Sequence, residues 1–322
     1  MDPRRLGKSN LSVAPLTLGT MTFASQLDEP AARSVVDLCL ERGLTFFDTA
    51  NVYNSGQSET MLGQILAGRR ERVILASKVG VKFSDAPEDQ GLSPTAIHKH
   101  IDGSLKRLQT DYLDVYYLHQ PDYATPLEQS LAAMDELVRA GKVRFVAVSN
   151  YASWQVCQML WLAETNGWQP IVAVQPMYNL LARRIEQELL PCCREFNLAA
   201  VPYNPLAGGL LSGKHLAAAP IAGTRFDRMP LYRDRYWHAE NFAAVERLRQ
   251  IAEKAGRSLV ELALGWVIQQ AGITSAILGV SRIEHLQTAL AVLEKPPLTA
   301  EVLAACDEAY APLRGIVPIY NR

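Results

Sequence analysis

The feature that most constrains the fold is a repeated unit, in which a short apolar segment is followed by a polar turn and an amphipathic helical pattern. Strands that alternate with helices at intervals of about 30 residues predict right-handed βαβ units and a parallel sheet. Eight such strands with no change of pattern favour a closed (β/α)8 barrel (TIM barrel) over an open doubly wound α/β sheet. The predicted strand ends are Leu18, Asp48, Lys78, His119, Ser149, Gln175, Tyr203 and Leu278.

Additional elements are expected at two places. Two short segments, Arg4–Leu6 and Leu11–Val13, flank Gly7-Lys8-Ser9-Asn10, which predicts an N-terminal β-hairpin that could plug the bottom of the barrel. The long interval between Tyr203 and Leu278 has room for extra helices and for an irregular segment, residues 215–238, that is rich in arginine and aromatic residues. Long structureless loops in compact domains are usually functional, so 215–238 is predicted to act as a lid. No linker divides the chain, and 1–322 is interpreted as one domain.

Charge and hydropathy argue against several classes of protein. Lys and Arg number 32 against 33 Asp and Glu, without a polybasic segment, so neither nucleic acid nor a membrane surface is a predicted partner. The most apolar stretch, Leu262 to Val280, is interrupted by Gln269-Gln270 and by glycines, and the chain starts without the apolar run of a signal peptide. Five cysteines lack disulfide or metal spacing, which indicates reduced thiols and a cytoplasmic location.

Polar residues stand at three consecutive predicted strand ends. Asp48 ends one strand and has Tyr53 in the turn that follows; Lys78 and His119 end the next two. Active sites of parallel barrels lie at this end of the strands, and neighbouring strands are about 4.8 Å apart, so these side chains are expected to converge. Taken singly, Asp48 could cap a turn, Lys78 could be a solvated charge and His119 a buried core residue. Their coincidence at adjacent strand ends favours a catalytic group.

Together, the four side chains are suited to donating a proton to a substrate. A free tyrosine has a pKa near 10, and an ammonium group beside it favours the phenolate. Lys78, held by Asp48, would therefore tune Tyr53 as a general acid, and a neutral His119 would orient a substrate carbonyl. No partner nucleophile is implied, so the predicted site protonates a developing alkoxide and needs hydride from elsewhere. His98 and His100 are two residues apart on a predicted helix and face different ways, so no metal site is predicted.

Ordered motifs along the chain resemble those of the aldo-keto reductase superfamily, in particular its bacterial and potassium-channel β-subunit-like branch. The resemblance extends from about Leu6 to Ala311. The motifs are Phe47-Asp48-Thr49-Ala50-x-x-Tyr53, Gly56-x-Ser58-Glu59, Ser77-Lys78, Tyr112-Leu113-Asp114-x-x-x-Leu118-His119, Val148-Ser149-Asn150, Gln175-x-x-Tyr178-Asn179 and Tyr203-Asn204-Pro205-Leu206-Ala207-x-Gly209-Leu210-Leu211-x-Gly213-Lys214. The family tetrad falls on Asp48, Tyr53, Lys78 and His119.

The resemblance implies a barrel that binds NADP(H) across its mouth, without a GxGxxG fingerprint. Ser149, Asn150 and Gln175 would hold the carboxamide, and Tyr203 would stack on the nicotinamide. The family's other cofactor positions fall on Thr20, Met21, Asp48, Asn204, Pro205, Leu206, Gly208, Lys214, Arg225, Gly279, Ser281, Arg282 and His285. The segment 215–238 would cover the bound cofactor.

The adenosine end departs from the family pattern. This chain has His285 where the family often has Gln or Arg, and Ala289 where it has Asn. Arg282 could pair with the ribose 2′-phosphate that distinguishes NADPH from NADH. NADPH is therefore the predicted cofactor, with NADH left open.

The predicted activity is NADPH-dependent reduction of a small-molecule aldehyde or ketone. Phe83 and Trp154 are predicted to contact substrate, together with Tyr53 and His119. Two alternatives remain open: a non-enzymatic, NADP(H)-sensing regulatory subunit, and a barrel aldolase that uses Lys78 as a Schiff-base nucleophile. The sequence specifies neither the physiological carbonyl nor the oligomeric state.

Overall fold

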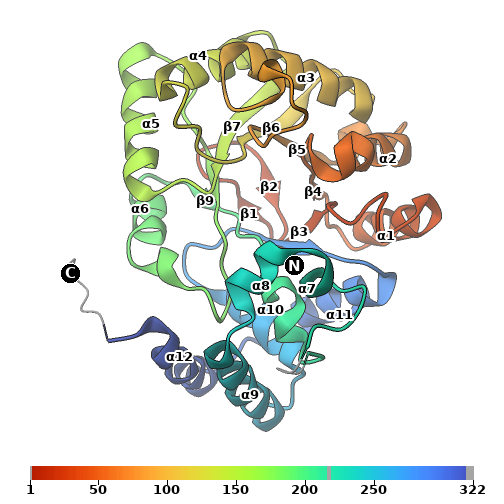
Figure 1. Cartoon of the computed structure of the whole chain (residues 1–322), viewed down its shortest axis with the longest axis vertical. Coiled ribbons are helices and arrows are strands. Elements are labelled where there is room, and N and C mark those ends of the chain that lie inside the picture. The colour runs from red at the N-terminus through yellow and green to blue at the C-terminus, as the bar shows by residue number, and fades with distance from the viewer. Residues whose placement is uncertain (1, 216–218, 317–322) are drawn as a thin grey trace.

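A computed structural model describes residues 2–215 and 219–316. Its centre is a barrel of eight parallel strands surrounded by helices (Figure 1). The strands are β3 (Leu16–Gly19), β4 (Phe46–Asp48), β5 (Ile74–Val79), β6 (Leu113–Leu118), β7 (Val143–Ser149), β8 (Ala173–Gln175), β9 (Ala199–Ala200) and β10 (Ala276–Gly279).

The barrel closes between β9 and β10. The other strands pair side by side in the order β10-β3-β4-β5-β6-β7-β8-β9. Across the remaining gap, the Thr274 N–H donates to the Ala200 carbonyl at 2.8 Å, and the Ile277 N–H donates to the Pro202 carbonyl at 2.8 Å. Parallel pairing continues to Tyr203, three residues after the regular part of β9 ends. The predicted (β/α)8 barrel is confirmed.

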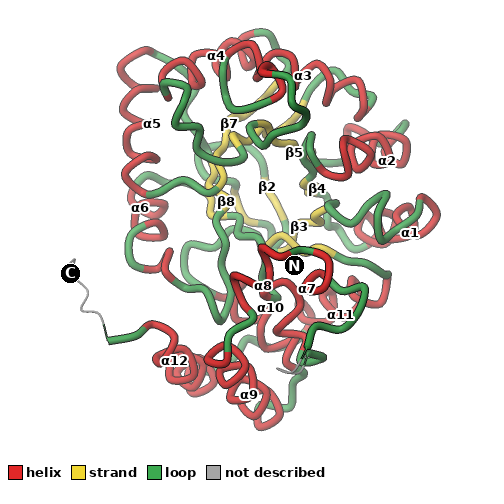
Figure 2. Tube along the Cα trace, in the orientation of Figure 1, coloured by secondary structure: helices red, strands yellow, loops and turns green. Residues whose placement is uncertain are grey.

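Helices form the outer layer (Figure 2). Some of them begin at residues whose side chains cap them: Asp28 accepts a hydrogen bond from the Ala31 N–H, and Ser93 accepts one from the Ala96 N–H. None of the helices in the described part of the chain is long and apolar enough to cross a membrane. Their bounds are α1 (Glu29–Glu41), α2 (Gln57–Leu66), α3 (Pro94–Leu108), α4 (Leu127–Arg139), α5 (Ser153–Asn166), α6 (Leu189–Glu195), α9 (Ala239–Lys254), α10 (Leu259–Gln269), α11 (Ile283–Glu294) and α12 (Ala300–Arg314).

The predicted hairpin is present and packs into one end of the barrel. It consists of β1 (Arg4–Arg5) and β2 (Ser12–Val13), paired antiparallel. Leu6 and Val13 are buried and belong to the same apolar cluster as the inward-facing side chains of the strands. Gly7 makes the close approach possible: its φ is +56°, and a Cβ there would lie 2.2 Å from the Val172 carbonyl oxygen.

Part of the segment predicted to be irregular is helical. It contains α7 (Arg225–Arg228) and α8 (Pro230–Tyr236), while residues 216–218 lie outside the described residues. Phe226 is fully buried, with its ring 5.0 Å from that of His215 and 5.1 Å from that of Trp237. The prediction that the segment 215–238 is irregular throughout was therefore wrong. These helices are too short to show a helical period, and tertiary aromatic contacts hold them in place.

Candidate active site

The barrel strands bring the four predicted catalytic residues to one end of the barrel. Asp48 is the last residue of β4, Lys78 lies near the end of β5, and His119 directly follows β6. The strands pair in parallel register, with Asp48 beside Ala76 and Lys78 beside Tyr117. The sequence spacing and the sheet register together place these side chains on the same rim.

Tyr53 reaches the site from a tight turn. It begins η1 (Tyr53–Gly56), where Asn54 and Ser55 have left-handed φ values of 49° and 54°. The Asn54 side-chain amide donates to the carbonyls of Met21 and Phe23 at 3.0 and 2.6 Å, which ties the turn to the loop after β3. Such backbone conformations cost of order 1 kcal/mol or more each and need this kind of external support.

Lys78 connects the acidic and phenolic groups. Its ammonium donates to Asp48 Oδ1 at 2.5 Å, to the Thr49 carbonyl at 2.7 Å and to the Tyr53 hydroxyl at 3.3 Å. The second carboxylate oxygen of Asp48 accepts from Gln175 Nε2 at 2.8 Å. Lys78 is fully buried and Asp48 nearly so. The arrangement is a satisfied, buried ion pair with a phenol at its edge.

Burial and charge act in opposite directions on these groups. Burial raises the pKa of Tyr53, and the Lys78 ammonium lowers it by less, so the net shift is upward. The downward shift expected from the sequence is therefore wrong for the protein without a bound ligand, because burial outweighs the neighbouring charge. Burial works to lower the pKa of Lys78, but Asp48 and Tyr53 more than offset it and keep the amine protonated. At neutral pH the site combines a protonated phenol with an ammonium ion.

His119 is neutral and has a free ring nitrogen. Burial, aided by the Lys78 charge, lowers its pKa to about 3. Its backbone N–H donates to the Val79 carbonyl at 2.8 Å, and its ring meets that of Tyr53 edge-on, with 6.0 Å between centroids. Nδ1 is buried without a hydrogen-bond partner among the described residues. Because Nδ1 is closed to solvent, the other ring nitrogen of this neutral, cavity-lining imidazole is the one that can donate a hydrogen bond to an oxygen atom beside Tyr53.

A second layer of buried polar residues supports the site. Ser58 donates to the Thr20 carbonyl at 2.7 Å, and its hydroxyl lies 2.9 Å from that of Thr20. Glu59 is fully buried, accepting from Ser77 at 2.5 Å and from Arg107 at 2.7 Å. These bonds tie the start of α2 to β3, β5 and α3. Thr20, predicted to contact the cofactor, lies in this layer and does not line the cavity within the described residues.

A cavity of about 890 Å³ opens above the tetrad. It runs from Asp48, Tyr53 and His119 across the barrel mouth to the start of α11. This volume lies at the upper end for a ligand pocket and exceeds what a small carbonyl compound would fill. The predicted cofactor residues that line it are Met21, Asp48, Ser149, Asn150, Gln175, Tyr203, Asn204, Pro205, Leu206, Gly208, Lys214, Arg225, Gly279, Ser281, Arg282 and His285.

Near the tetrad, the lining residues form a hydrogen-bonded chain. The Ser149 hydroxyl donates to the Gln175 carbonyl at 2.8 Å, and the Asn150 amide donates to the His119 carbonyl at 2.9 Å. The Tyr203 hydroxyl donates to Asn150 Oδ1 at 2.8 Å. The chain fixes the orientation of the polar groups that face the cavity beside His119.

Farther along the cavity, basic side chains line the wall, and a glycine lets the backbone pass close to a neighbouring ring. Gly208 in η5 (Ala207–Ser212) has a φ of +70°, and a Cβ there would lie 2.6 Å from the Tyr232 ring. Lys214 and Arg225 line this part and form no ion pair with any acidic residue that the structure describes. Asn204 Nδ2 is buried without a partner in the described chain. This wall offers cationic and hydrogen-bond-donating groups to an anionic ligand.

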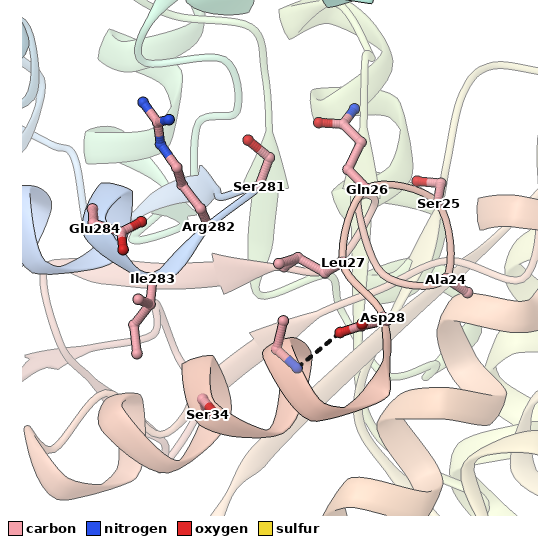
Figure 3. Close-up of a pocket in the computed structure, with 11 residues that line it drawn as sticks. Ala24, Ser25, Gln26, Leu27, Asp28, Ser34, Ser281, Arg282, Ile283 and Glu284 are labelled. Carbon is pink, nitrogen blue, oxygen red and sulfur yellow. Dashed lines mark hydrogen bonds between the residues drawn. The ribbon is translucent and has the colours of Figure 1, made fainter.

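The far end of the cavity lies at the start of α11. Arg282 occupies the N-cap without a side-chain cap hydrogen bond, and of the first three helical N–H groups that of His285 donates to the Arg282 carbonyl at 3.2 Å. The Arg282 guanidinium donates to His285 Nε2 at 2.9 Å. A second, open cavity of about 730 Å³ adjoins this end, with Ser281 and Arg282 on one wall and Gln26 and Leu27 across from them (Figure 3).

The structure separates two predicted substrate residues from the cavity. Among the described residues that line it, Phe83 and Trp154 are absent. Phe83 packs against His100, 5.5 Å between ring centroids, and Trp154 on α5 is 64% exposed.

Sequence reasoning missed several lining residues, namely Gln26, Val52, Val81, Gln120, Met229, Leu231, Tyr232 and Arg235. Of these, Arg235 was predicted only as one of the arginines of the segment 215–238 that covers the cofactor, without a contact of its own. Its inward position depends on the packing of α8, for which the sequence pattern carries no signal. The described residues contain no group of three or more His, Cys, Asp or Glu that could hold a metal ion.

Comparison with known proteins agrees with the fold. The model of the aldo/keto reductase family matches residues 15–311. Aflatoxin B1 aldehyde reductase member 2 of Homo sapiens is 38% identical over 324 residues, which cover 95% of this chain and 89% of that protein. The uncharacterized oxidoreductase YrpG of Bacillus subtilis (strain 168) is 36% identical over 330 residues, covering 99% of this chain and 98% of that protein.

A further relative bears the name of a channel subunit. The probable voltage-gated potassium channel subunit beta of Arabidopsis thaliana is 31% identical over 310 residues, covering 94% of both chains. The resemblance inferred from the motifs is confirmed. The chain belongs to the aldo/keto reductase family, a family of oxidoreductases.

Proposed function

We propose that this protein is an NADPH-dependent reductase of aldehydes or ketones. The observation that carries the proposal is the buried Asp48–Lys78–Tyr53 arrangement, which opens beside a neutral His119 into a cavity with a basic far wall. A protonated phenol and a neutral imidazole are donors suited to a carbonyl oxygen that gains negative charge. The cavity, of about 890 Å³, has room for a second ligand besides the carbonyl compound.

The residues present fit a phosphorylated dinucleotide. The cationic groups of Lys214, Arg225 and Arg282 face the cavity, and Asn204 supplies a buried amide that lacks a partner in the described chain. The uncapped N-terminus of α11 adds N–H donors and a favourable dipole for a phosphate group. When bound, a reduced nicotinamide would supply the hydride. Ser149, Asn150, Gln175 and Tyr203 would hold it beside the tetrad.

The chain's own part of the mechanism is the delivery of a proton. His119 would donate a hydrogen bond to the carbonyl oxygen and orient it toward the Tyr53 hydroxyl. As charge develops on that oxygen, Tyr53 transfers its proton, and the Lys78 ammonium stabilises the phenolate that remains. Asp48 keeps Lys78 in position and charged. Lys78 is unsuited to Schiff-base chemistry, since it is buried, protonated and bonded to three partners.

The proposal is tested by incubating the purified full-length chain with NADPH and a panel of aldehydes and ketones, with NADH in parallel. Consumption of NADPH that depends on the carbonyl compound and produces the alcohol is the expected result. The channel-subunit relative makes a cofactor-sensing protein the second candidate. Tight NADPH binding without turnover of any carbonyl compound would favour that candidate and contradict the reductase.

The choice between the two cofactors is proposed to depend on Arg282. Replacement with alanine should weaken NADPH binding by about ten- to hundredfold, because a charge-assisted hydrogen bond to the 2′-phosphate contributes roughly 1.5–3 kcal/mol. NADH lacks that phosphate and should bind almost unchanged. Fluorescence titration of both cofactors measures the difference. Equal losses for NADPH and NADH would place Arg282 outside the phosphate site.

The segment 215–238 is proposed to cover the bound cofactor and slow its release. Arg225 lines the cavity, with its guanidinium 4.9 Å from the Tyr232 ring centroid, and can gain Coulomb energy only when phosphate is bound. Arg225→Ala should raise the NADPH off-rate in stopped-flow fluorescence while single-turnover hydride transfer stays nearly unchanged. Arg233→Ala is the matched control, because Arg233 is exposed on the same segment. An unchanged off-rate in Arg225→Ala would exclude the lid role.

A further inference from the structure

Two cysteines that are far apart in the sequence lie in contact on the outer surface of the barrel. Cys157 belongs to α5 and Cys192 to α6, which are neighbouring helices (Figure 1). Their Sγ atoms are 3.8 Å apart. Sequence spacing had indicated five unrelated thiols, because 35 residues of chain separate this pair and only the packing of the two helices unites it.

The pair differs from the other cysteines in its access to solvent. Cys157 is exposed and Cys192 half-buried, whereas Cys39, Cys193 and Cys306 are buried in the apolar core. Exposure decides which thiols an oxidant can reach. Cys157 is therefore the thiol that an oxidant meets first, and the nearest sulfur to it is that of Cys192.

We propose that Cys157 and Cys192 are a modification site, which a hydroperoxide converts into a reversible disulfide joining α5 to α6. A disulfide has an S–S length of about 2.05 Å, so the sulfur atoms must approach by a little under 2 Å. Rotation about the two Cα–Cβ bonds, with small helix shifts, can supply such a movement at an exposed site. Neither residue lines the cavity in the described part of the chain.

The chemistry needs one hydroperoxide and runs in two steps. The Cys157 thiolate attacks one peroxide oxygen, the O–O bond breaks, and the leaving oxygen departs as water after taking up a proton. Sulfur is thereby oxidised to a sulfenic acid. Cys192 then attacks that sulfur, the S–O bond breaks, and a second water carries off the hydroxyl group and the Cys192 proton. Hydrogen peroxide is reduced to two waters, and two thiols become one disulfide.

The order of the steps follows from the surroundings of the two sulfurs. Burial, together with the neighbouring Cys157, raises the pKa of Cys192 to about 12, so Cys192 carries little thiolate in the reduced protein. It is thus a poor first target for peroxide. Contact with Cys157 gives it a high effective concentration toward the sulfenic acid, which suits the resolving role.

The test is titration of the full-length protein with hydrogen peroxide, followed by alkylation and non-reducing peptide mapping. Trypsin leaves Cys192 and Cys193 in one peptide, because it cleaves the chain after Arg184 and next after Arg194. Cys193→Ala is therefore the matched control that should still give the cross-linked peptide. In wild type and in this control, two thiols should disappear and return with a dithiol. Cys157→Ser, which keeps only Cys192 of the pair, should lose no thiol.

Two further measurements keep the proposal falsifiable. In Cys192→Ser, oxidation should stop at the Cys157 sulfenic acid, which dimedone traps. The oxidised wild-type protein should melt a few °C higher than the reduced protein, since the disulfide closes a long chain loop. Further oxidation of Cys157 to the sulfinic acid with Cys192 present, or disulfide-linked dimers in place of the internal bond, would overturn the proposal.

Discussion

Replacing Tyr53 with phenylalanine is expected to lower kcat for carbonyl reduction by about 10²–10⁴-fold, the range that a positioned general acid contributes. The substitution removes only the hydroxyl group that lies 3.3 Å from the Lys78 ammonium. The ring can keep its edge-on contact with His119, and the Asp48–Lys78 ion pair keeps its other hydrogen bonds. NADPH binding, measured by fluorescence titration, should remain near the wild-type value.

The contrast between binding and turnover makes this variant informative. A variant that binds NADPH but does not reduce the carbonyl compound assigns the proton to Tyr53. If kcat stays near the wild-type value, the proton comes from another group. If NADPH binding is lost as well, Tyr53 acts in cofactor binding. Tyr232→Phe is the matched control, because Tyr232 also lines the cavity but does not contact Lys78.

The barrel was predictable because it depends on local signals repeated along the chain. The apolar segments that end in Asp48, Lys78 and His119 predict three strands, and they also predict that each polar residue lies at the end of its strand, on the rim of the barrel. Parallel pairing then places them side by side, whatever the details of packing. Tyr53 was assigned from its distance after Asp48, and the structure adds the turn held by Asn54 that directs it.

Features that depend on tertiary packing were not predictable in this way. Helix α8 turns Arg235 into the cavity, and the aromatic contacts of Phe226 hold that region together. Trp154 follows the Ser149-Asn150 motif closely in sequence, yet α5 directs it to solvent. The contact between Cys157 and Cys192 arises only when two helices pack. Nothing in the local sequence pattern encodes these positions, because they depend on contacts between distant segments.

The net effect of burial on the pKa of Tyr53 was also not predicted from the sequence. Sequence reasoning counted the Lys78 charge, which lowers the pKa of Tyr53, but it had no measure of how deeply the phenol is buried. The opposing shifts leave Tyr53 protonated at neutral pH, as a proton donor must be. Carbonyl reduction should therefore decline only at alkaline pH, where the phenol ionises.

The Lys78→Met variant should lose both stability and activity. Methionine fills a similar volume but leaves the buried Asp48 carboxylate with Gln175 as its remaining side-chain partner. Breaking a buried ion pair from one side usually lowers the free energy of unfolding by about 3–5 kcal/mol. Chemical denaturation measures this loss. Activity should fall as well, because no ammonium remains to stabilise the Tyr53 phenolate.

The stability loss should depend on pH, with a sign that follows from Asp48. Burial raises the pKa of this carboxyl, and Lys78 opposes the rise in the wild type. Without Lys78 the folded-state pKa climbs further above the unfolded value of about 3.9. A raised pKa gives stability that is fully present below the unfolded pKa and is lost as pH rises through the folded one. The deficit of Lys78→Met should therefore be smallest in acid and grow toward neutral pH.

A double variant separates the charge from the packing. Asp48→Asn combined with Lys78→Met removes both charges, and the Asn oxygen can still accept from Gln175 Nε2. Its free energy of unfolding should recover most of the loss and no longer depend on pH through this residue, because no uncompensated carboxylate is buried. Carbonyl reduction should stay low, because Tyr53 still lacks its ammonium partner. A double variant as unstable as Lys78→Met would show that lost packing, and not the isolated Asp48 charge, destabilises the single variant.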